Sequence, residues 1–504
     1  MCPGVSLCFF TRWYTREGVY SIIAGMNTMN TRRDFLKGTA WMGAAAFAAG
    51  CTAPGFGFGD GGQMAGFRMK PMKRVRVGFV GLGARGGWAV RRNCSVPGVD
   101  IVAICDKKDI RIEESLKFLS EQGRPEPKVF RGEEGWKALC ETDGIDAVYI
   151  ATPWALHAPV GLRALRNGKI AFIEVPAALT VDECWDLVET SEKMRIPCMQ
   201  LENCVYNEVE MLEYNIAKLG LLGELVHAEG AYIHDLRGLN KLTGKANSGE
   251  SEWRYGENLE HKGNRYPTHG LVPLCLAFDI NRGDRFDYLV SLESNQANFE
   301  FYKKHVLDKD DPRLKDHPVE MGDMNTTLIK TLRGKSIMLQ HDVSTPRPYS
   351  RLQLISGTKG TIADYPFRVA LEEKVGDGKA HKEWMDEKAT AEFREKYKHP
   401  LHKTVGSIAK KVGGHDGMDF IMDLRWAYCL QNGLPLDTDV YDLATTSCLC
   451  ELTEKSVRNR SRAYDIPDFT RGGWKTAKPL GIINVDVAKL DFSNIKAGEK
   501  PMTL

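Results

Sequence analysis

The sequence predicts an α/β protein whose N-terminal half is a doubly wound parallel sheet. Two observations carry this prediction. A buried-strand pattern runs into a glycine-rich turn and a helical stretch, and further strand patterns then alternate with helical stretches up to residue 203. A chain of 504 residues with 43% hydrophobic and 27% charged residues also has the composition of an ordinary soluble globular protein. We therefore expect a real core and more than one domain.

The charge balance excludes some classes of partner. The chain has 68 Lys and Arg against 66 Asp and Glu, a formal net charge of +2. Nucleic-acid and membrane-surface binding both need a concentrated basic stripe, because it must displace counterions or meet anionic lipid. The balance favours a small-molecule partner and no nucleic acid.

Residues 1–50 are interpreted as a targeting region. The run Thr31-Arg32-Arg33-Asp34-Phe35-Leu36-Lys37 precedes a small and apolar stretch that ends at Gly50 and is too short to span a bilayer. This layout is typical of a twin-arginine signal, which exports folded proteins and so suits an enzyme that acquires its cofactor first. A buried N-terminal helix with two chance arginines is the alternative, and the true start is open between Met1, Met26 and Met29.

Cys51 ends a segment that resembles a bacterial lipoprotein cleavage box without its usual Leu. The destination is therefore open between the periplasm and a membrane-anchored lipoprotein, and a lipid on Cys51 is the one membrane contact we expect. A linker rich in Gly, Met and Pro follows, at residues 51–72. None of the 13 cysteines forms a CxxC pair, so we expect no metal site and no disulfide framework.

The first strand, Arg74 to Val80, leads into Gly81-Leu82-Gly83-Ala84-Arg85-Gly86, and a second strand from Val99 ends in Asp106. Glycines at 81, 83 and 86 let the backbone approach a pyrophosphate, whose charge the amides of the next helix meet. Asp106 can accept hydrogen bonds from ribose hydroxyls and repel a 2′-phosphate, which favours NAD. Lys107 and Lys108 leave NADP open.

Three more strands, at 146–152, 169–174 and 196–201, complete a predicted Rossmann domain at 73–203. Ligands of such sheets bind beyond the carboxyl ends of the strands. The segments to inspect are therefore Ala151 to His157, Glu174-Val175-Pro176 and Glu202-Asn203.

These three strand ends resemble those of the Gfo/Idh/MocA oxidoreductase superfamily. Its dehydrogenases usually carry a catalytic Lys in the E-K-P turn, where this sequence has Val175. The departure argues against ordinary alcohol oxidation. The resemblance implies that residues 204–504 form an α/β domain with an open, largely antiparallel sheet and C-terminal helices that pack back on the first domain. Strands are expected at 225–232, 324–333, 335–343 and 352–355, and a helix at 418–430.

Longer motifs resemble glycoside hydrolase family 109, whose members are NAD-dependent α-N-acetylgalactosaminidases. The strongest is Gly263-Asn264-Arg265-Tyr266-Pro267-Thr268-His269-Gly270-Leu271, and Tyr232-Ile233-His234-Asp235 and Gly417-Met418-Asp419-Phe420 are further matches. The resemblance implies NAD as cofactor and a glycan with terminal α-linked N-acetylgalactosamine as substrate. An exported NAD(P)-dependent sugar oxidoreductase is the alternative activity, a non-catalytic nucleotide-binding module is a third, and a homo-oligomer is left open.

Site residues carry over motif by motif. The implied cofactor contacts beside the three glycines are Ala84, Arg85, Asp106, Trp154, Ala155, Leu156, His157, Glu174, Val175 and Asn203. The implied substrate contacts are Tyr232, Arg254, Tyr266, Pro267, Thr268, His269 and Tyr349, of which Arg254 and Tyr349 are aligned by spacing in looser surroundings. His157 could instead steady the helix that follows it, and Tyr232 could simply pack beneath its sheet.

The family resemblance also implies a route without net redox change. Hydride leaves sugar C3 for NAD, a base removes the C2 proton, the aglycone is eliminated, water adds, and the hydride returns. Such a route needs a base and an acid, for which His269, Tyr266, Tyr232 and His234 are the available side chains. We assign His269 as base and Tyr266 as the group that positions or protonates, and the individual roles could be exchanged.

Overall fold

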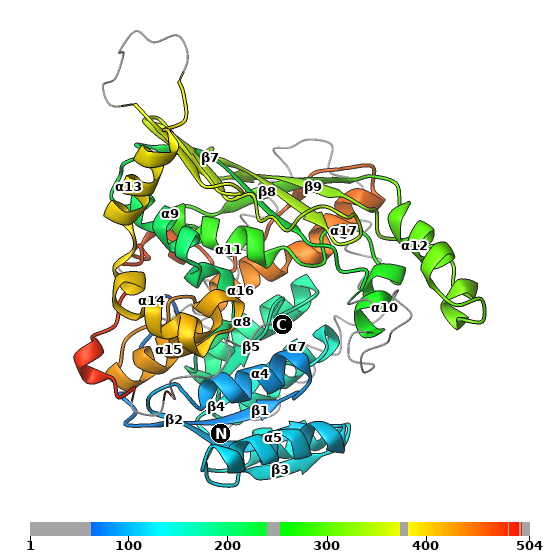
Figure 1. Ribbon diagram of the computed structural model, residues 1–504, viewed down its shortest axis with the longest axis vertical. Helices are drawn as coiled ribbons and strands as arrows, with labels where there is room; N and C mark the ends of the chain where they lie inside the picture. Colours follow the sequence, from blue (N-terminus) through cyan, green and yellow to red (C-terminus); the bar gives the residue numbers. More distant parts are fainter. Residues whose placement is uncertain (1–61, 239–251, 373–381, 482, 493–494, 496–504) are drawn as a thin grey trace, which may run out of the picture. The chain divides into compact units, whose positions relative to one another are not determined.

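The computed structural model places two sheets and the helices around them (Figure 1). The residues that it describes are 62–238, 252–372, 382–481, 483–492 and 495. The predicted twin-arginine signal, the alternative start residues and Cys51 lie outside these residues. Within the described part, no helix is long and apolar enough to cross a membrane.

The first sheet has six parallel strands in the order β3-β2-β1-β4-β5-β6, which confirms the predicted doubly wound fold. Its strands are β1 (Val75–Val80), β2 (Val99–Asp106), β3 (Lys128–Arg131), β4 (Ala147–Ile150), β5 (Ile170–Ile173) and β6 (Cys198–Gln200). The sequence analysis missed β3, because this edge strand is four residues long and buries none of them fully.

Helices connect these parallel strands. They are α4 (Ala84–Asn93), α5 (Asp109–Glu121), α6 (Gly135–Glu141), the short η1 (Trp154–Leu156), α7 (His157–Arg166) and α8 (Val181–Met194). Helix α4 contacts α5, while α6, α7 and α8 contact one another in series. Helix α8 begins at a capping box, in which the Thr180 hydroxyl accepts from the Glu183 amide and the Glu183 carboxylate accepts from the Thr180 amide.

The second sheet has eight strands in the order β13-β12-β11-β7-β10-β9-β8-β14. Every neighbouring pair is antiparallel except β7 with β10, so the predicted open, largely antiparallel sheet is confirmed. Its strands are β7 (Leu225–Ile233), β8 (Phe286–Glu293), β9 (Asn325–Thr331), β10 (Ser336–Asp342), β11 (Leu354–Gly357), β12 (Gly360–Ala363), β13 (Arg368–Leu371) and β14 (Tyr464–Asp465). The four predicted strands correspond to β7, β9, β10 and β11.

Helices α9, α11, α16 and α17 join the two sheets into one core. Helix α11 packs on β7 and α9, and α16 contacts both α11 and the first-sheet elements α8 and β6. The helices and short turns from α9 onward are α9 (Glu208–Lys218), α10 (Glu252–Glu260), α11 (Thr268–Ala277), α12 (Asn298–Val306), α13 (Glu387–Tyr397), α14 (Pro400–Val412), α15 (Met418–Asn432), α16 (Val440–Ser447), α17 (Leu449–Arg458) and the 3-10 turns η2 (Asn203–Tyr206), η3 (Pro312–Lys315), η4 (His415–Gly417), η5 (Gly473–Lys475) and η6 (Val487–Lys489).

Helix α15 packs against the parallel sheet. Its Trp426 ring lies 4.6 Å from the Phe172 ring of β5, and Asp423 pairs with Arg92 of α4 at 3.0 Å. Helix α15 confirms the helix expected at 418–430, and its residues from Met418 to Leu430 are all buried. The ten cysteines of the described chain are all buried and free.

Candidate active site

The glycine-rich turn after β1 fits a pyrophosphate. Gly81 has φ +86°, and a Cβ on Gly86 would lie 1.7 Å from the Gly81 carbonyl oxygen, so neither position accepts a side chain. Helix α4 starts beyond Gly83 with no side-chain cap and no acidic residue in its first turn. The start of α4 therefore brings no negative charge to the place where a pyrophosphate would bind, which suits the predicted dinucleotide site.

Asp106 ends β2 beside this turn. Its carboxylate accepts hydrogen bonds from the Leu82 amide at 2.6 Å and the Lys108 amide at 2.8 Å. Each carboxylate oxygen has a second lone pair, so the group can still accept from ribose hydroxyls. The accepting carboxylate and the glycine turn beside it together fit NAD.

The segment after β4 is tied to the turn after β5. The buried His157 ring directs Nδ1 at the Pro176 carbonyl oxygen (2.7 Å) and Nε2 at the Thr152 carbonyl oxygen (2.8 Å). Trp154 donates from Nε1 to the Val175 carbonyl at 3.2 Å. His157 thus holds two strand ends in register, while Ala155 in the same segment is exposed.

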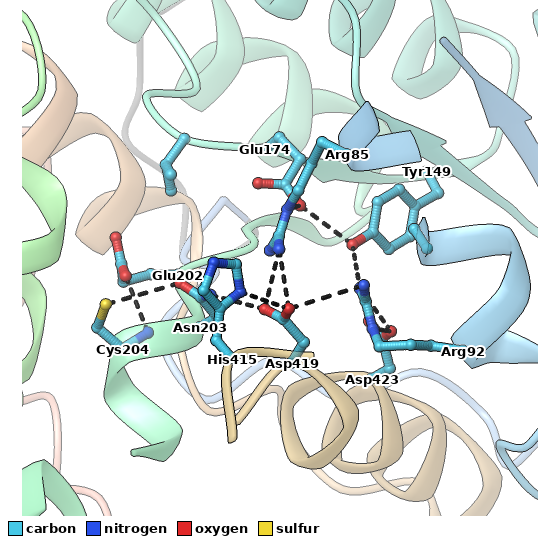
Figure 2. A network of polar contacts seen from close by, with 12 residues as sticks. Arg85, Arg92, Tyr149, Glu174, Glu202, Asn203, Cys204, His415, Asp419 and Asp423 are labelled. Carbon is cyan, nitrogen blue, oxygen red and sulfur yellow. Dashed lines mark hydrogen bonds and ion pairs between the residues drawn. The ribbon is translucent and has the colours of Figure 1, made fainter. Parts of the chain in front are cut away.

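A network of charged side chains lies beside the glycine-rich turn and the end of β5 (Figure 2). Arg85 donates from Nε to Glu174 at 2.6 Å and from Nη1 to both carboxylate oxygens of Asp419 at 3.0 Å. Asp419 also accepts from Asn203 at 2.6 Å and pairs with His415 at 2.8 Å. Although burial alone raises the pKa of Asp419, the charges of Arg85 and its neighbours hold that pKa well below its usual range.

Residue 202 carries a second network. Glu202 lies just past the end of β6. Its carboxylate accepts hydrogen bonds from His269 Nδ1 at 2.7 Å and from the Cys204 amide at 3.0 Å. Burial raises the pKa of Glu202, but the His269 ring beside it outweighs that effect, and the net pKa is below the usual value. With Glu202 ionised, Nδ1 carries the proton, which leaves Nε2 of His269 as the basic nitrogen.

The aromatic residues of the predicted substrate site surround His269. The Tyr266 ring lies 4.8 Å from the rings of both Tyr232 and His269, and 5.6 Å from that of Trp154. Tyr232 shares a 3.0 Å hydrogen bond with His234 Nδ1. The rings of Trp154, Tyr266 and Tyr232 form an aromatic wall that extends from the segment after β4 to His269.

Arg254 and Tyr349 also reach this wall. The Arg254 guanidinium carbon lies 5.0 Å from the Trp154 ring centre and 5.7 Å from that of Tyr266, in cation–π range. The Tyr349 ring lies 4.9 Å from His234 and its hydroxyl accepts from Arg351 at 2.8 Å. Arg254 and Tyr349, which were aligned only by spacing, therefore lie beside the other candidate substrate contacts.

Burial and nearby charges determine which side chains around the aromatic wall carry a proton. Burial raises the pKa of Tyr232 to about 12 and that of Tyr266 well above its usual value, so both hydroxyls stay protonated. Burial, with help from the charge of His269, lowers the pKa of His234 to about 4. His234 is therefore neutral and accepts the Tyr232 proton at Nδ1.

The structure thus gathers the predicted residues into two adjoining groups. Pro267 and Thr268 are buried in the segment that presents Tyr266 and His269, where they shape the backbone. The roles of Glu202 and Asp419 were missed, although Glu202 was among the strand ends to inspect and Asp419 stood in a family motif. Glu202, Cys204 and His269 also bring three potential metal-ligand atoms within 4.8 Å, a grouping that the sequence analysis did not foresee.

Comparisons with known proteins match the two halves of the chain to two family models. The family model described as "Glycosyl hydrolase 109, C-terminal domain" matches residues 206–476, and "Oxidoreductase family, NAD-binding Rossmann fold" matches residues 75–200. A protein of Bacteroides fragilis named alpha-N-acetylgalactosaminidase is 46% identical over 82% of this chain and 96% of its own length. A glycosyl hydrolase family 109 protein of Shewanella pealeana is 46% identical over 84% of this chain and 91% of its own.

Solved structures share the fold at low identity. An NAD-binding oxidoreductase from Klebsiella pneumoniae aligns with a TM-score of 0.59 at 16% identity, and covers 79% of this chain and all of its own. A levoglucosan dehydrogenase in complex with NADH and levoglucosan aligns with a TM-score of 0.58 at 18% identity, over 78% of this chain and all of its own.

Proposed function

Because the chain belongs to glycosyl hydrolase family 109 and is an NAD-dependent glycosidase, we propose that it cleaves terminal α-linked N-acetylgalactosamine by oxidation, elimination, water addition and reduction. The observation that carries the proposal is the Glu202–His269 pair, which lies beside an aromatic wall that extends to a dinucleotide-binding strand edge. The 46% identical relative named for this substrate supports the choice of sugar. Glycosidases that use NAD in place of two carboxylates are an established exception.

When bound at the glycine turn and Asp106, NAD would supply a reversible hydride acceptor for sugar C3. The residues of the chain supply the proton transfers. His269 Nε2 takes the proton from C2, and Glu202 stabilises the imidazolium that forms, because its carboxylate lies against Nδ1. Tyr266 keeps its proton and can donate it to the leaving oxygen, while Tyr232, which is bonded to His234, orients the sugar.

Val175 bears on the alternative activity. A net sugar oxidoreductase of this superfamily would usually carry Lys at that position, and Val175 is 3% exposed within the aromatic cluster that includes Trp154 and Tyr266. An apolar side chain there offers no proton acceptor for a simple alcohol oxidation. Because the proposed route also begins with oxidation at C3, Val175 shows only that the Lys usual in the net oxidoreductases is absent, and the family match favours the glycosidase.

The purified holoenzyme tests the proposal without added cofactor. We expect it to release p-nitrophenol from p-nitrophenyl α-N-acetylgalactosaminide in heavy water, with deuterium at C2 of the free sugar. Cleavage without deuterium at C2 would contradict the elimination route, and stoichiometric accumulation of NADH would favour the oxidoreductase. Tyr266→Phe and His269→Asn should abolish turnover while NAD stays bound, and full activity of both variants would refute the site.

The same proposal includes export by the twin-arginine route to the periplasm or to a lipid anchor at Cys51. It rests on the sequence pattern at Arg32 and Arg33. Replacing both arginines by Lys should leave the enzyme in the cytoplasm, and unchanged export would contradict this part. Cys51→Ala separates the two destinations, since it should release an anchored enzyme and leave a free one unaffected.

A further inference from the structure

A buried arginine beside Tyr349 has no part in the proposed proton transfers. The Arg351 side chain is 4% exposed and donates from Nη1 to the Tyr349 hydroxyl at 2.8 Å. Its Nε donates at 2.5 Å to Oε1 of Glu210, a fully buried residue of α9. A buried ion pair contributes little net stability, because the desolvation of the two charges offsets their attraction. Stability alone is therefore a weak reason for an ion pair at this place.

Arg351 determines the direction of the hydrogen bond at Tyr349. A guanidinium group has only donors, so the Tyr349 oxygen must be the acceptor. Burial raises the pKa of Tyr349 above its usual value, so the hydroxyl keeps its own proton. Among the residues that the structure describes, none accepts a hydrogen bond from that proton, and Tyr349 is 37% exposed. The proton is therefore available to an acceptor on a bound molecule.

Tyr349 lies among the candidate substrate contacts. Its ring is 4.9 Å from that of His234 and 6.3 Å from that of Tyr232, edge-on in both cases. The charge of Arg351 reaches the same place, because it lowers the pKa of Tyr232 against the larger effect of burial. A molecule that accepts the Tyr349 proton would therefore lie beside Tyr232 and His234.

The backbone that carries both side chains is anchored on the end of β7. Ser350 and Ile233 exchange two hydrogen bonds of 3.0 Å. The amide two residues after Arg351 donates to the Arg351 carbonyl at 2.7 Å, across Leu352 with φ +60°. This is a γ-turn of the rare, strained form. Strain of this kind persists where the surroundings fix a conformation, and it clusters at functional sites.

The same segment also contacts helix α11. Gln353 is fully buried and donates from Nε2 to the Gly270 carbonyl at 3.2 Å, and Gly270 follows His269 in the chain. Glu210, the partner of Arg351, lies on α9, which packs against α11. The Arg351 guanidinium is therefore fixed relative to His269 by contacts through α9 and through the strained turn.

We propose that Arg351 is a positioning residue that makes Tyr349 a hydrogen-bond donor to an acceptor oxygen of the bound sugar. This inference rests on the proposed function for the identity of the sugar. Glu210 holds the guanidinium, and the guanidinium occupies a lone pair of the Tyr349 oxygen, so the phenolic proton points away from Arg351. Tyr349 then favours a carbonyl or hydroxyl oxygen at the position that it meets and disfavours an ammonium group, which has no acceptor.

A double-mutant cycle tests this role. Tyr349→Phe removes the hydroxyl, and Arg351→Lys keeps the charge but replaces the two donors by one compact ammonium group. We expect each variant to raise KM for p-nitrophenyl α-N-acetylgalactosaminide about tenfold with kcat within threefold, as the loss of one hydrogen bond would. The double variant should be no worse than either single variant. Additive losses would overturn the proposal, since Arg351 would then act independently of the hydroxyl.

A second variant covers the case in which Arg351→Lys does not fold. Arg351→Met combined with Glu210→Leu removes both charges, so that neither is left buried and unpaired. It should show the same rise in KM and no further loss when Tyr349→Phe is added. Arg394→Lys is the matched control, because Arg394 also pairs with a glutamate of α9, Glu208 at 3.0 Å, and its KM should equal that of the wild type.

Calorimetric binding of free N-acetylgalactosamine to the holoenzyme gives a readout that needs no turnover. Arg351→Lys should bind the sugar about tenfold more weakly than the wild type, with NAD affinity unchanged. Equal sugar affinities would overturn the role of Arg351. A wild-type enzyme that binds the sugar without cleaving the nitrophenyl glycoside would defeat the proposed hydrolysis, and the comparison of sugar affinities would still decide the role of Arg351.

Discussion

His269 Nδ1 lies 2.7 Å from a carboxylate oxygen of Glu202, a contact that joins the start of α11 to the end of the last strand of the parallel sheet. Glu202 is 1% exposed, so its charge acts on the imidazole without competition from water. The next residue, Asn203, binds Asp419 and through it Arg85. The consecutive residues Glu202 and Asn203 therefore orient His269 and hold the Asp419–Arg85 pair beside the dinucleotide site.

Glu202→Gln should reduce kcat about 10²- to 10⁴-fold with little change in NAD affinity. A neutral amide can accept from or donate to Nδ1, so it neither enforces the reactive tautomer nor stabilises the imidazolium. Steady-state kinetics, together with NAD titration by protein fluorescence, separates the two effects. Glu133→Gln, at an exposed residue paired with Lys107, is the control. A Glu202→Gln enzyme within threefold of wild type would remove Glu202 from the mechanism.

Gly86→Ala should abolish tight NAD binding. Its Cβ would lie 1.7 Å from the Gly81 carbonyl oxygen, so the turn must open and its amides must leave the pyrophosphate position. Gly256→Ala in α10 is a matched control, since a Cβ there has nothing within 4 Å. Calorimetric titration of NAD should show at least a tenfold weaker Kd for the first variant alone. Equal affinities would mean that the dinucleotide binds elsewhere.

Tyr232→Phe should lower kcat by about tenfold to a hundredfold and leave the fold intact. The change removes one hydroxyl, which donates to neutral His234 at 3.0 Å, and keeps the ring that packs on Tyr266 and His269. Thermal unfolding within a few degrees of wild type would establish that the ring still packs. If kcat is unchanged, Tyr232 is a packing residue and the hydroxyl has no part in orienting the sugar.

Local patterns in the sequence were enough to predict the parallel sheet and the strand ends that line the candidate cofactor site, whereas the candidate substrate contacts came from the family resemblance. The glycine turn, Asp106 and the strand ends each lie within a few residues of a strand whose apolar run can be recognised. The pairs Glu202–His269 and Arg85–Asp419 could not be predicted in this way, because their members lie on separate elements that only tertiary packing brings together. The short strands β3 and β14 carry too few buried residues to give a pattern.

Asp419→Asn should destabilise the protein at pH 7 by up to about 3–5 kcal/mol, since Arg85 then keeps only Glu174, and Arg92 only Asp423, as a buried counter-charge. The folded pKa of Asp419 is well below the ordinary value of about 4. Its contribution to stability is therefore complete above that ordinary value and is lost as the pH falls through the folded pKa. Urea unfolding between pH 7 and pH 3 should show the gap between wild type and variant narrowing at the acid end. A gap that is constant over this range would contradict the ionised pair.

Asp423→Asn should show the opposite pH dependence. Asp423 also pairs with Arg92, yet burial and the neighbouring charge of Asp419 raise its pKa to about 6. A carboxyl group whose folded pKa exceeds its unfolded pKa contributes its stability below the unfolded value, and loses it as the pH rises through the folded pKa. The gap between wild type and this variant should therefore be largest near pH 4 and shrink by pH 7, in the same urea series. If both variants follow one pH dependence, the two carboxyl groups titrate as equivalents, and the bond from Arg85 to Asp419, which Asp423 lacks, does not set them apart.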